Sequence, residues 1–525
     1  MHSSAVFKSS PHCRPSPDGR LIATLDSWTV SIRSTDTLQI TNVVKLGPGS
    51  GSSSASSSLS SSASTTFLWA PSSAKFLVSV ADQIEVFSAV RASPFRATIS
   101  SPLSGGGKPS AIQFGARDTE LLVWSTSGLK LVIFDLCTSK VVEITSPKFH
   151  QPASVSRGLS FRPGTGHLVL LTRVGGKDLV SLHHPISRQV QRSWSPDTLD
   201  AQGLTWTPDG RWLLVWESPA QGHRILLYAA DGQHFRTIGA ANLLKEPSAD
   251  LEPGIKLCQL SPDAQLCAVG DHGRGIAVIR TDSWRTSLRL LHPTTIVPRD
   301  TLQVWQEQIA ASSLEGRSTH TFLRATQLLS PPGPPADSKT SAELKPGCSM
   351  AAFDASSTLL ATRLDDSPCA VWIWDVAAAE LRAVLIFHGS VNFQWHPSSR
   401  ELLLVTCLDT AQRGMAFVWD PLSNGPTPVA PEDHLPNGKA VGKIQIVWIN
   451  RETEFPVLLV SDAQHYVMLS PLSLDQGLNP WQRANEGQWD DGEVQMLEGM
   501  TPARVAADDT DETSVLDDTF SFRNA

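Results

Sequence analysis

Short apolar runs recur along this chain, and many of them form pairs separated by a polar turn. The clearest pair spans Leu204 to Trp216, with the sequence LTWTPDGRWLLVW. At its centre Pro208 presets φ for a turn, Asp209 can bond the backbone just ahead, and Gly210 tolerates a positive φ. Two apolar runs joined by such a turn predict a β-hairpin. Because a single hairpin is only marginally stable in water, the pattern is informative only if it recurs.

The pair does recur, in weaker copies, along most of the chain. Successive copies start about 40 to 55 residues apart, except for one gap of about 93, and most are followed by a further short β-rich run, as in WD repeats with four strands each. The nine copies start near residues 13, 67, 111, 158, 203, 257, 350, 391 and 444.

Two of the β-rich runs end in Trp-Asp, the dipeptide that gives WD repeats their name. We therefore predict an all-β fold, a WD-repeat β-propeller, as one closed ring of eight or nine divergent blades whose closure protects the strand edges. Two seven-bladed rings would need about fourteen units, more than the chain holds. The Gly-His dipeptide that usually opens a repeat is essentially missing, so the His-Asp hydrogen-bonded network of ideal repeats is not expected.

The residues that mark the repeats are predicted to be structural. The chain has 16 Trp but only 2 Tyr, and most of these Trp sit at the ends of apolar runs, where they would pack between blades. Trp28, and Trp284 with Arg285, are candidates for exposed anchors of a partner, although blade packing explains them equally well. The predicted signature residues are Pro17, Asp18, Gly19, Trp69, Trp206, Pro208, Asp209, Gly210, Trp374, Asp375, Trp395, Trp419, Asp420 and Trp448.

Three stretches break the repeat pattern. The propeller is predicted to span 1–474, with a disordered Ser-rich insert at 47–64 and a second insert, with a possible hairpin, at 293–347. An acidic tail, also expected to be disordered, follows at 475–525. We interpret it as a solvated tail that aids solubility, and a docking motif in its SVLDDTFSF pattern at 514–522 is the alternative.

Composition excludes several classes of function. No apolar run approaches the roughly 20 residues that a membrane span needs, and the N-terminus lacks the apolar core of a signal peptide. The 7 Cys are scattered and form no CxxC pair, which is typical of reduced thiols in a cytosolic or nuclear protein. The net charge is −8, and because the tail contributes twelve acids against three arginines (−9), the body is near +1. A neutral body argues against nucleic acid as the main partner.

The spacings that catalysis or metal binding needs are missing. There is no HExxH, GxSxG or EF-hand pattern. Pro109 follows the Gly105–Lys108 run, which also lacks the leading Gly of a phosphate loop. His183 and His184 are adjacent, so on a strand they face opposite sides, and a surface pair is the better interpretation. Asp365 and Asp366 are expected in a turn, and Cys258 and Cys267 in the core as thiols.

We therefore predict no catalytic, cofactor-binding or metal-binding residues and no enzyme activity. An enzyme site at the propeller centre is a further alternative, which converging carboxylates or histidines would support.

Several landmarks resemble one WD-repeat family. They include Phe7-Lys8-Ser9-Ser10, then SPDGR at 16–20 and RSTDTLQI at 33–40, followed by LVIFDLCTSKVV at 131–142, AVWIWD at 370–375 and FQWHP at 393–397. These are similar to the family of WD repeat-containing protein eight, known in vertebrates as the WD-repeat protein antisense to tumour protein seventy-three. The resemblance spans roughly residues 5 to 470, so it covers neither the Ser-rich insert nor the tail.

The resemblance implies a non-enzymatic scaffold at the centrosome or spindle pole body, within the cytoplasmic cytoskeleton. The implied partners are a coiled-coil microtubule-anchoring protein and a minus-end-directed kinesin, and the implied role is anchoring microtubule minus ends and organising the mitotic spindle. No nucleic-acid, membrane or small-molecule partner is expected. The alternative is a large-propeller translation initiation factor, which requires a basic ribosome-contacting face.

Overall fold

The structure is a computed structural model, and it covers most of the predicted propeller. The Ser-rich insert at 47–64 and most of the tail at 475–525 lie outside the residues that it describes. The described residues are 1–46, 65–80, 83–100, 102–103, 109–244, 252–311, 318–333, 347–399, 401–408, 414–436, 440–450, 455–471, 481 and 520–522.

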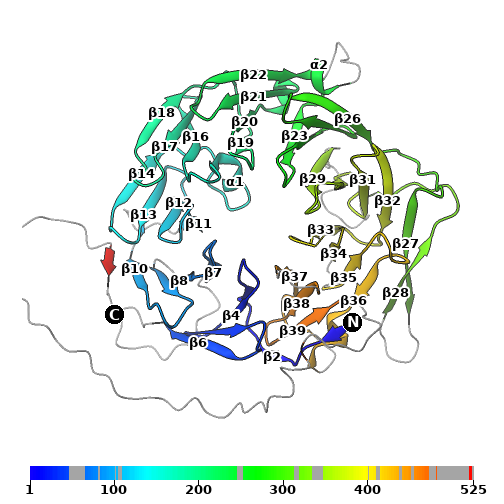
Figure 1. Cartoon of the computed structure of the whole chain (residues 1–525), viewed down its shortest axis with the longest axis horizontal. Helices are drawn as coiled ribbons and strands as arrows, with labels where there is room; N and C mark the ends of the chain where they lie inside the picture. The colour runs from blue at the N-terminus through cyan, green and yellow to red at the C-terminus, as the bar shows by residue number, and fades with distance from the viewer. Residues whose placement is uncertain are drawn as a thin grey trace, which may run out of the picture.

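Nine antiparallel sheets stand side by side around a central axis and form a ring (Figure 1). The structure is therefore a propeller with nine blades, the upper of the two predicted numbers. Each of the nine predicted hairpins supplies the two inner strands of one blade. The strands of the first five blades are β3 (Cys13–Pro15), β4 (Leu21–Asp26), β5 (Thr29–Ser34) and β6 (Ile40–Lys45) in blade 1; β7 (Thr66–Trp69), β8 (Lys75–Val80), β9 (Gln83–Ser88) and β10 (Arg96–Ser100) in blade 2; β11 (Pro109–Phe114), β12 (Glu120–Ser125), β13 (Lys130–Asp135) and β14 (Val141–Thr145) in blade 3; β15 (Leu159–Phe161), β16 (Leu168–Val174), β17 (Lys177–His183) and β18 (Val190–Trp194) in blade 4; and β19 (Gly203–Trp206), β20 (Trp212–Trp216), β21 (Arg224–Ala229) and β22 (His234–Gly239) in blade 5.

The remaining blades follow the same order from the inside of the ring to the outside. Blade 9 takes only three strands from its own part of the chain. The strands are β23 (Ile255–Leu260), β24 (Leu266–Asp271), β25 (Gly275–Arg280) and β26 (Arg285–Leu291) in blade 6; β29 (Cys348–Phe353), β30 (Leu359–Leu364), β31 (Ala370–Asp375) and β32 (Glu380–Ile386) in blade 7; β33 (Val391–Trp395), β34 (Leu403–Cys407), β35 (Ala416–Trp419) and β36 (Thr427–Val429) in blade 8; and β37 (Gln445–Ile449), β38 (Val457–Ser461) and β39 (His465–Ser470) in blade 9.

The N-terminus closes the ring. The strands β1 (His2–Ser3) and β2 (Phe7–Lys8) both pair antiparallel with β39, so they supply the outer edge of blade 9. Ser4 lies between them, and its backbone N donates to the Met468 carbonyl at 2.9 Å. Because the first residues of the chain complete its last blade, these strands hold the two ends of the ring together.

Two further additions lie outside the four-strand pattern. In the long gap of the repeat, β27 (Gln303–Ala311) and β28 (Ser318–Arg324) form a hairpin, and β27 pairs parallel with β32 to extend blade 7 outwards (Figure 1). From the tail, β40 (Phe520–Phe522) pairs antiparallel with β10 and gives blade 2 a fifth strand.

Helical structure is confined to short connections. Within the described part of the chain no helix is long and apolar enough to cross a membrane. The helical segments are α1 (Val155–Gly158), α2 (Ala240–Leu243) and the 3-10 turns Pro219–Gln221 and Pro431–Asp433.

The hydrophobic core lies between adjacent blades. In β20 the consecutive residues Leu213, Leu214 and Val215 are all fully buried, although neighbours on a strand point to opposite faces. This is because every blade is covered by a neighbour on each side, so its middle strands must be apolar on both faces. Trp481, from the predicted tail, is 1% exposed and packs in the core that joins blades 9 and 1.

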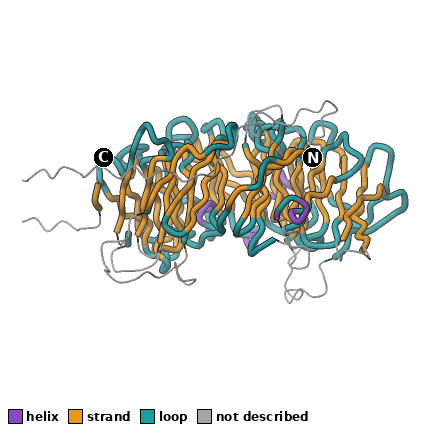
Figure 2. Tube along the Cα trace, turned by 90° about the horizontal axis from the view of Figure 1, so that it is seen from below, coloured by secondary structure: helices purple, strands orange, loops and turns teal. Residues whose placement is uncertain are grey.

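The strand order gives the ring two different faces, seen edge-on in Figure 2. Because the four strands of a blade alternate in direction, the turns from first to second and from third to fourth strand lie at one end. We call that end the lower face. The upper face carries the connections from second to third strand and those from one blade to the next.

Candidate partner-binding face

The lower face is built from turns whose polar groups bond within the turn. In the Thr-Pro-Asp-Gly turn, Thr207 Oγ1 accepts from the Trp212 N–H at 3.0 Å and donates to Asp209, while Asp209 Oδ1 accepts from the Arg211 N–H at 3.0 Å. Gly210 has φ of +68°, the left-handed region that favours glycine. Pro208 occupies the position before Asp209, as predicted for this turn.

The same arrangement recurs around the ring. Ser16 and Asp18 bond Leu21 and Arg20 in blade 1, where Pro17 precedes the Asp and Gly19 has φ of +69°. Such turns leave few unsatisfied polar groups to offer a partner. The other predicted acids are also turn formers on this face: Asp375 accepts from the Ala378 N–H and Asp420 from the Leu422 N–H.

Three predicted tryptophans link the inner strands of neighbouring blades. The indole Nε1 of Trp69 donates to the Arg14 carbonyl at 3.1 Å, and that of Trp448 donates to the Gln394 carbonyl at 3.2 Å. Trp395 repeats the pattern, with the Ala352 carbonyl as acceptor at 2.8 Å. Each carbonyl belongs to the preceding blade, so these side chains hold adjacent blades in register.

The other predicted tryptophans are core residues. Trp206 is buried in the core between blades 4 and 5, and its backbone N–H donates to Ser160 Oγ at 3.2 Å. Trp419 lies fully buried between blades 7 and 8. Trp284, suggested as an exposed anchor, is 2% exposed and packs in the core of blades 5 and 6, so that suggestion is wrong. Trp28 is 42% exposed on the upper face, in the β4–β5 connection.

Blade 7 contains a histidine-centred network that the sequence did not lead us to expect. His292 Nδ1 contacts the Arg274 carbonyl at 2.8 Å, and its Nε2 contacts Thr362 Oγ1 at 2.8 Å. Trp374, from the Trp-Asp dipeptide, donates its Nε1–H to the same Thr362 oxygen at 3.1 Å. Burial lowers the pKa of His292 to about 4, which keeps the ring neutral as this network requires. The network joins His292 to a threonine and a tryptophan and not to an aspartate, so it differs from the His-Asp network of ideal repeats, and His292-Pro293 stands where those repeats have Gly-His.

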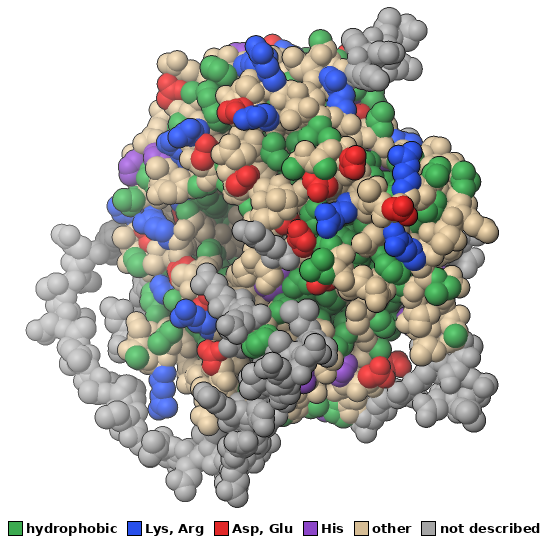
Figure 3. Space-filling model, turned by 45° about the vertical axis from the view of Figure 1, so that its right-hand side comes forward, with side chains coloured by type: hydrophobic (Ala, Val, Ile, Leu, Met, Phe, Trp, Pro, Cys, Tyr) green, Lys and Arg blue, Asp and Glu red, His purple; other side chains and the backbone are tan. Residues whose placement is uncertain are grey.

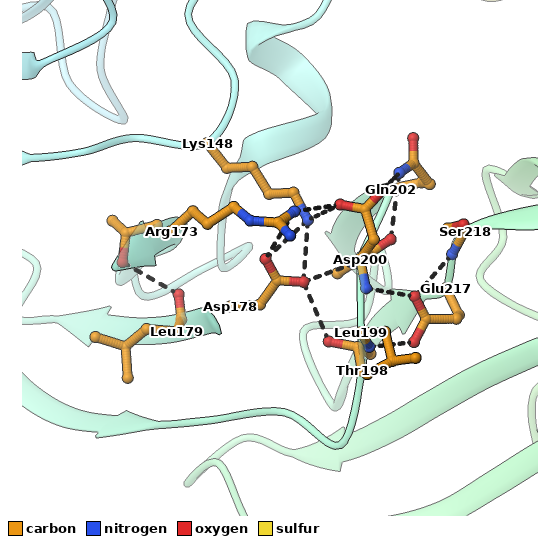
Figure 4. Close-up of polar contacts among 12 residues, drawn as sticks. Lys148, Arg173, Asp178, Leu179, Thr198, Leu199, Asp200, Gln202, Glu217 and Ser218 are labelled. Carbon is orange, nitrogen blue, oxygen red and sulfur yellow. Dashed lines mark hydrogen bonds and ion pairs between the residues drawn. The ribbon is translucent and has the colours of Figure 1, made fainter. Parts of the chain in front are cut away.

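The upper face is held together by charged groups from different connections (Figure 4). Lys148 Nζ lies 2.8 Å from Asp178 Oδ1 and 2.9 Å from Asp200 Oδ1, and Arg173 Nη1 also pairs with Asp200 at 2.5 Å. Burial opposes ionisation of Asp200, but the hydrogen bonds and charges of Lys148 and Arg173 outweigh it and lower the pKa of Asp200.

A second buried acid fixes the neighbouring connection. Glu217 is 0% exposed and accepts three backbone N–H groups, those of Leu199 and Asp200 at 2.8 Å and of Ser218 at 2.9 Å. Asp178 accepts a fourth, from Ala201, at 2.6 Å. The connection between blades 4 and 5 is therefore anchored from below, while the Leu199 side chain is 66% exposed.

Among the described residues, more large apolar side chains are exposed on the upper-face connections than on the lower-face turns, and the others lie at the N-terminus, on outer strands or in the insert of blade 7. On the lower face the exposed ones are Val90, Ile186 and Leu422, each on a separate turn. Exposed apolar groups on rigid connections are typical of surfaces that bind other proteins. Those on the upper face are Trp28, Leu129, Val174, Leu199, Leu291, Leu408 and Val441.

The largest cavity described lies where blades 8, 9 and 1 meet, with a volume of about 1210 Å³. Leu408, Met415 and Ile444 line its apolar part, and Arg14 and Lys443 its basic part. Among the described residues that line it there is no carboxylate and no histidine, so the acid–base groups that an enzyme site would need do not converge there. The described residues also contain no group of three or more His, Cys, Asp or Glu that could hold a metal ion.

The two histidines of the predicted surface pair differ in environment. His183 is 1% exposed and bonds Ser181 Oγ and the Arg188 carbonyl, each at 2.9 Å, so it is a core residue and the surface interpretation is wrong for it. His184 lies in the following turn, where its Nδ1 accepts from the N–H groups of Ile186 and Ser187.

The remaining residues that the sequence singled out either have structural roles or lie outside the described residues. Asp365 and Asp366 do lie in a turn, but they pair with Lys256 and Arg274 of blade 6. Cys258 and Cys267 are free thiols. In the Gly105–Lys108 run, no residue is among those that the structure describes.

The space-filling view bears on the translation-factor alternative (Figure 3). On the side of the ring that it shows, lysine and arginine side chains are scattered among acidic, apolar and uncharged ones. Ribosome or RNA binding needs basic groups gathered on one face. This side therefore does not favour that alternative.

Comparison with known proteins identifies relatives along most of the chain. No family model matches it. WD repeat-containing protein WRAP73 of Mus musculus is 26% identical over 453 residues, which cover 80% of this chain and 87% of the mouse protein. An uncharacterized WD repeat-containing protein of Schizosaccharomyces pombe is 25% identical over 420 residues, 76% of each chain.

Three solved structures of similar shape are distant in sequence. The C-terminal WD40 domain of Sif2 has a TM-score of 0.42 at 7% identity, covering 77% of this chain and 95% of that domain. The Dos1 propeller has a TM-score of 0.45 at 12% identity, with 78% and 93% covered. The dihydro-heme d1 dehydrogenase NirN has a TM-score of 0.43 at 12% identity, with 81% and 77% covered.

A ring of four-stranded antiparallel blades with Trp-Asp at strand ends defines a WD-repeat β-propeller. The relatedness to WD-repeat proteins that the motifs predict is confirmed by the similarity to WD repeat-containing protein WRAP73 of the mouse. Fold and relatives together support a protein-interaction scaffold.

Proposed function

We propose that this scaffold works at the spindle pole body or centrosome, where it helps to anchor microtubule minus ends and to organise the mitotic spindle. Its partners there would be a coiled-coil anchoring protein and a minus-end-directed kinesin. The observation that carries the proposal is the similarity to WRAP73 across 80% of the chain, together with the family landmarks in the sequence.

The upper face is the surface that best suits such a partner. A coiled-coil segment offers apolar side chains in a stripe with charged residues on either side. The upper face offers exposed apolar groups such as Leu129 and Leu199, and next to Leu199 it carries the ion pairs of Lys148, Asp178 and Asp200. A few buried anchors at such a surface supply most of the affinity.

Imaging and affinity purification test the cellular role. The full chain, tagged and expressed at its natural level, should concentrate at the spindle poles of mitotic cells and co-purify with a coiled-coil protein and a kinesin. Diffuse cytosolic signal, with ribosomal proteins as the main co-purifying set, would contradict the proposal.

Matched variants test the face. Leu129→Asp with Leu199→Asp changes two exposed upper-face positions, and Ile186→Asp with Leu422→Asp changes two exposed lower-face positions. Exposed substitutions of this kind alter stability by only about 0.5 kcal/mol, so both variants should fold. The upper-face pair should weaken partner binding about tenfold or more, which corresponds to about 1.4 kcal/mol, and abolish the polar signal, while the lower-face pair keeps both. The reverse outcome would move the binding surface to the lower face.

A further inference from the structure

A cavity of about 440 Å³ opens on the upper face between blades 5 and 6. Its walls are mostly aliphatic, with Leu243, Val269, Ile276 and Leu290 among the lining residues. At one end it is polar, because His223 and Asp271 also line it. Apolar walls with a few convergent polar groups are the usual make-up of a binding site.

His223 is an unusual residue to find at the end of such a cavity. It is 4% exposed, and neither ring nitrogen has a hydrogen-bond partner among the described residues. Nδ1 lies 3.7 Å from Glu252 Oε2 and Nε2 lies 3.8 Å from Asp271 Oδ2, both too long for hydrogen bonds. A buried polar group without a partner is costly and therefore calls for an explanation.

The two carboxylates have other partners that fix their positions. Asp271 Oδ1 accepts from the Gly273 N–H at 2.8 Å, and Glu252 Oε2 accepts from the backbone N–H of His223 at 2.7 Å. Asp271 Oδ2 is left facing His223 Nε2. When the ring proton is on Nδ1, toward Glu252, both Nε2 and Asp271 Oδ2 are acceptors with no proton between them.

We propose that this cavity binds a lysine or arginine side chain of a protein partner. An ammonium or guanidinium group placed between Nε2 and Asp271 donates a hydrogen bond to each acceptor and neutralises the carboxylate. The methylene stem of the same side chain lies against the aliphatic walls, as long basic side chains commonly do. An anionic ligand is disfavoured by the two carboxylates, and a purely apolar ligand would leave His223 unsatisfied.

Neighbouring charges leave this position open to a cation. Lys256 and Arg274, two basic residues of blade 6, pair with Asp365 and Asp366 of blade 7. Arg289, which also lines the cavity, donates to the carbonyls of Leu243 and Asn242 at the end of α2. Among the ion pairs of the described residues, none joins Asp271 to any of these three side chains.

The test uses the full chain alone with small probes, so that it is independent of the cellular role. The inference rests on the proposed function only in assigning the side chain to a protein partner. N-acetyl-lysine amide and N-acetyl-arginine amide are titrated into the chain labelled with ¹⁵N at histidine, and N-acetyl-norleucine amide, which keeps the stem but lacks the charge, is the matched control. The His223 resonance is assigned with His223→Gln.

Both basic probes should shift the His223 resonance saturably, and norleucine should not. In Asp271→Asn and Glu252→Gln the side-chain oxygen that accepts from the backbone is kept. Asp271→Asn should weaken the binding of the basic probes about tenfold or more, the size expected for a lost hydrogen bond to a charged group. Asp26→Asn, at the upper-face end of β4 and outside the cavity lining, should bind them as well as the unmodified chain.

Three results would overturn the proposal. Equal binding of the norleucine probe would show that the cavity selects only for apolar groups. Equal weakening of the basic probes by Asp26→Asn would show that the effect of Asp271→Asn is a general one of surface charge. If the ¹⁵N spectrum shows that His223 is an imidazolium in the free chain, the ring itself supplies the proton between Nε2 and Asp271, and no cation from a partner is needed there. If these probes bind as expected and the protein is not found at spindle poles, only the cellular proposal fails.

Discussion

The two faces of the ring are made from the same strands but in different ways. On the lower face, turns such as Thr207 to Gly210 satisfy their own polar groups, although the buried pair of Arg188 and Glu120 also joins blades 4 and 3 there. On the upper face the connections are irregular and are held by charges that reach between blades, such as Lys148 with Asp178.

This difference separates architecture from recognition. A turn that is complete in itself repeats from blade to blade and has little left to offer another molecule. A connection anchored from below, like the one carrying Leu199, can expose apolar groups without collapsing, because its backbone is held by Asp178 and Glu217. The lower-face turns therefore keep the same structure from blade to blade, whereas the upper-face connections can differ between blades.

The largest expected effect comes from removing the buried acid of the upper-face cluster. Asp178→Ala should lower the free energy of unfolding by about 3–5 kcal/mol, because Lys148 is left buried with one acid fewer. On the lower face Asp209→Ala should cost about 1 kcal/mol, since water can reach its turn. Urea unfolding followed by tryptophan fluorescence measures both. Equal losses would show that the two faces do not differ in this way.

The next effect concerns the network that ties an upper-face connection to the middle of blade 7. Thr362→Val leaves His292 Nε2 and Trp374 Nε1 without their shared oxygen, at about 1–2 kcal/mol for each nitrogen. Thr207→Val on the lower face, also buried, should cost less in the same urea titration, because Asp209 is partly exposed and can be solvated. A larger loss for Thr207→Val would reverse the comparison.

Acid should weaken both faces alike. Burial lowers the pKa of His292 on the upper face and of His396 on the lower face to about 4. An unfolded histidine titrates near 6.5, so between these values the unfolded chain binds protons that the folded chain does not, and stability falls as the pH drops from about 6.5 toward 4. The slope is at most about 1.4 kcal/mol per pH unit for each group.

Unfolding at pH 5, 6 and 7 checks this dependence. His292→Gln and His396→Asn should each flatten the slope, by similar amounts, relative to the unmodified chain. A slope unchanged in both variants would assign the acid sensitivity to other groups.

The smallest effect is expected in the channel wall, midway between the faces. Trp448→Phe removes the indole bond to the Gln394 carbonyl but keeps the aromatic packing, so we expect a loss of about 1 kcal/mol in the free energy of unfolding. Trp419→Phe, in the core and without such a bond among the described residues, serves as the control for lost volume. If Trp448→Phe loses no more unfolding free energy than Trp419→Phe, the indole hydrogen bonds do not contribute to the register between blades.

How far the sequence predicts this protein depends on how local the responsible interactions are. The turn at Asp209 and Gly210 was predictable because its bonds join residues at most five positions apart. The apolar runs likewise predicted the inner strands, since a strand buried on both faces must be apolar throughout. The network of His292, Thr362 and Trp374 was not predicted, because its members are up to 82 positions apart and its histidine lacks the usual preceding glycine.

By itself, then, the sequence determined the blades: their number to within one, their turns and the tryptophans between them. Only the tertiary structure decided which side chains meet across blades. It placed Trp284 in the core and Trp28 at the surface, closed the ring with β1 and β2, and brought His223 to Asp271 at the end of a cavity. The reason is physical, because hydrogen bonds within a turn are set by neighbouring residues, whereas contacts between blades depend on how the whole ring closes.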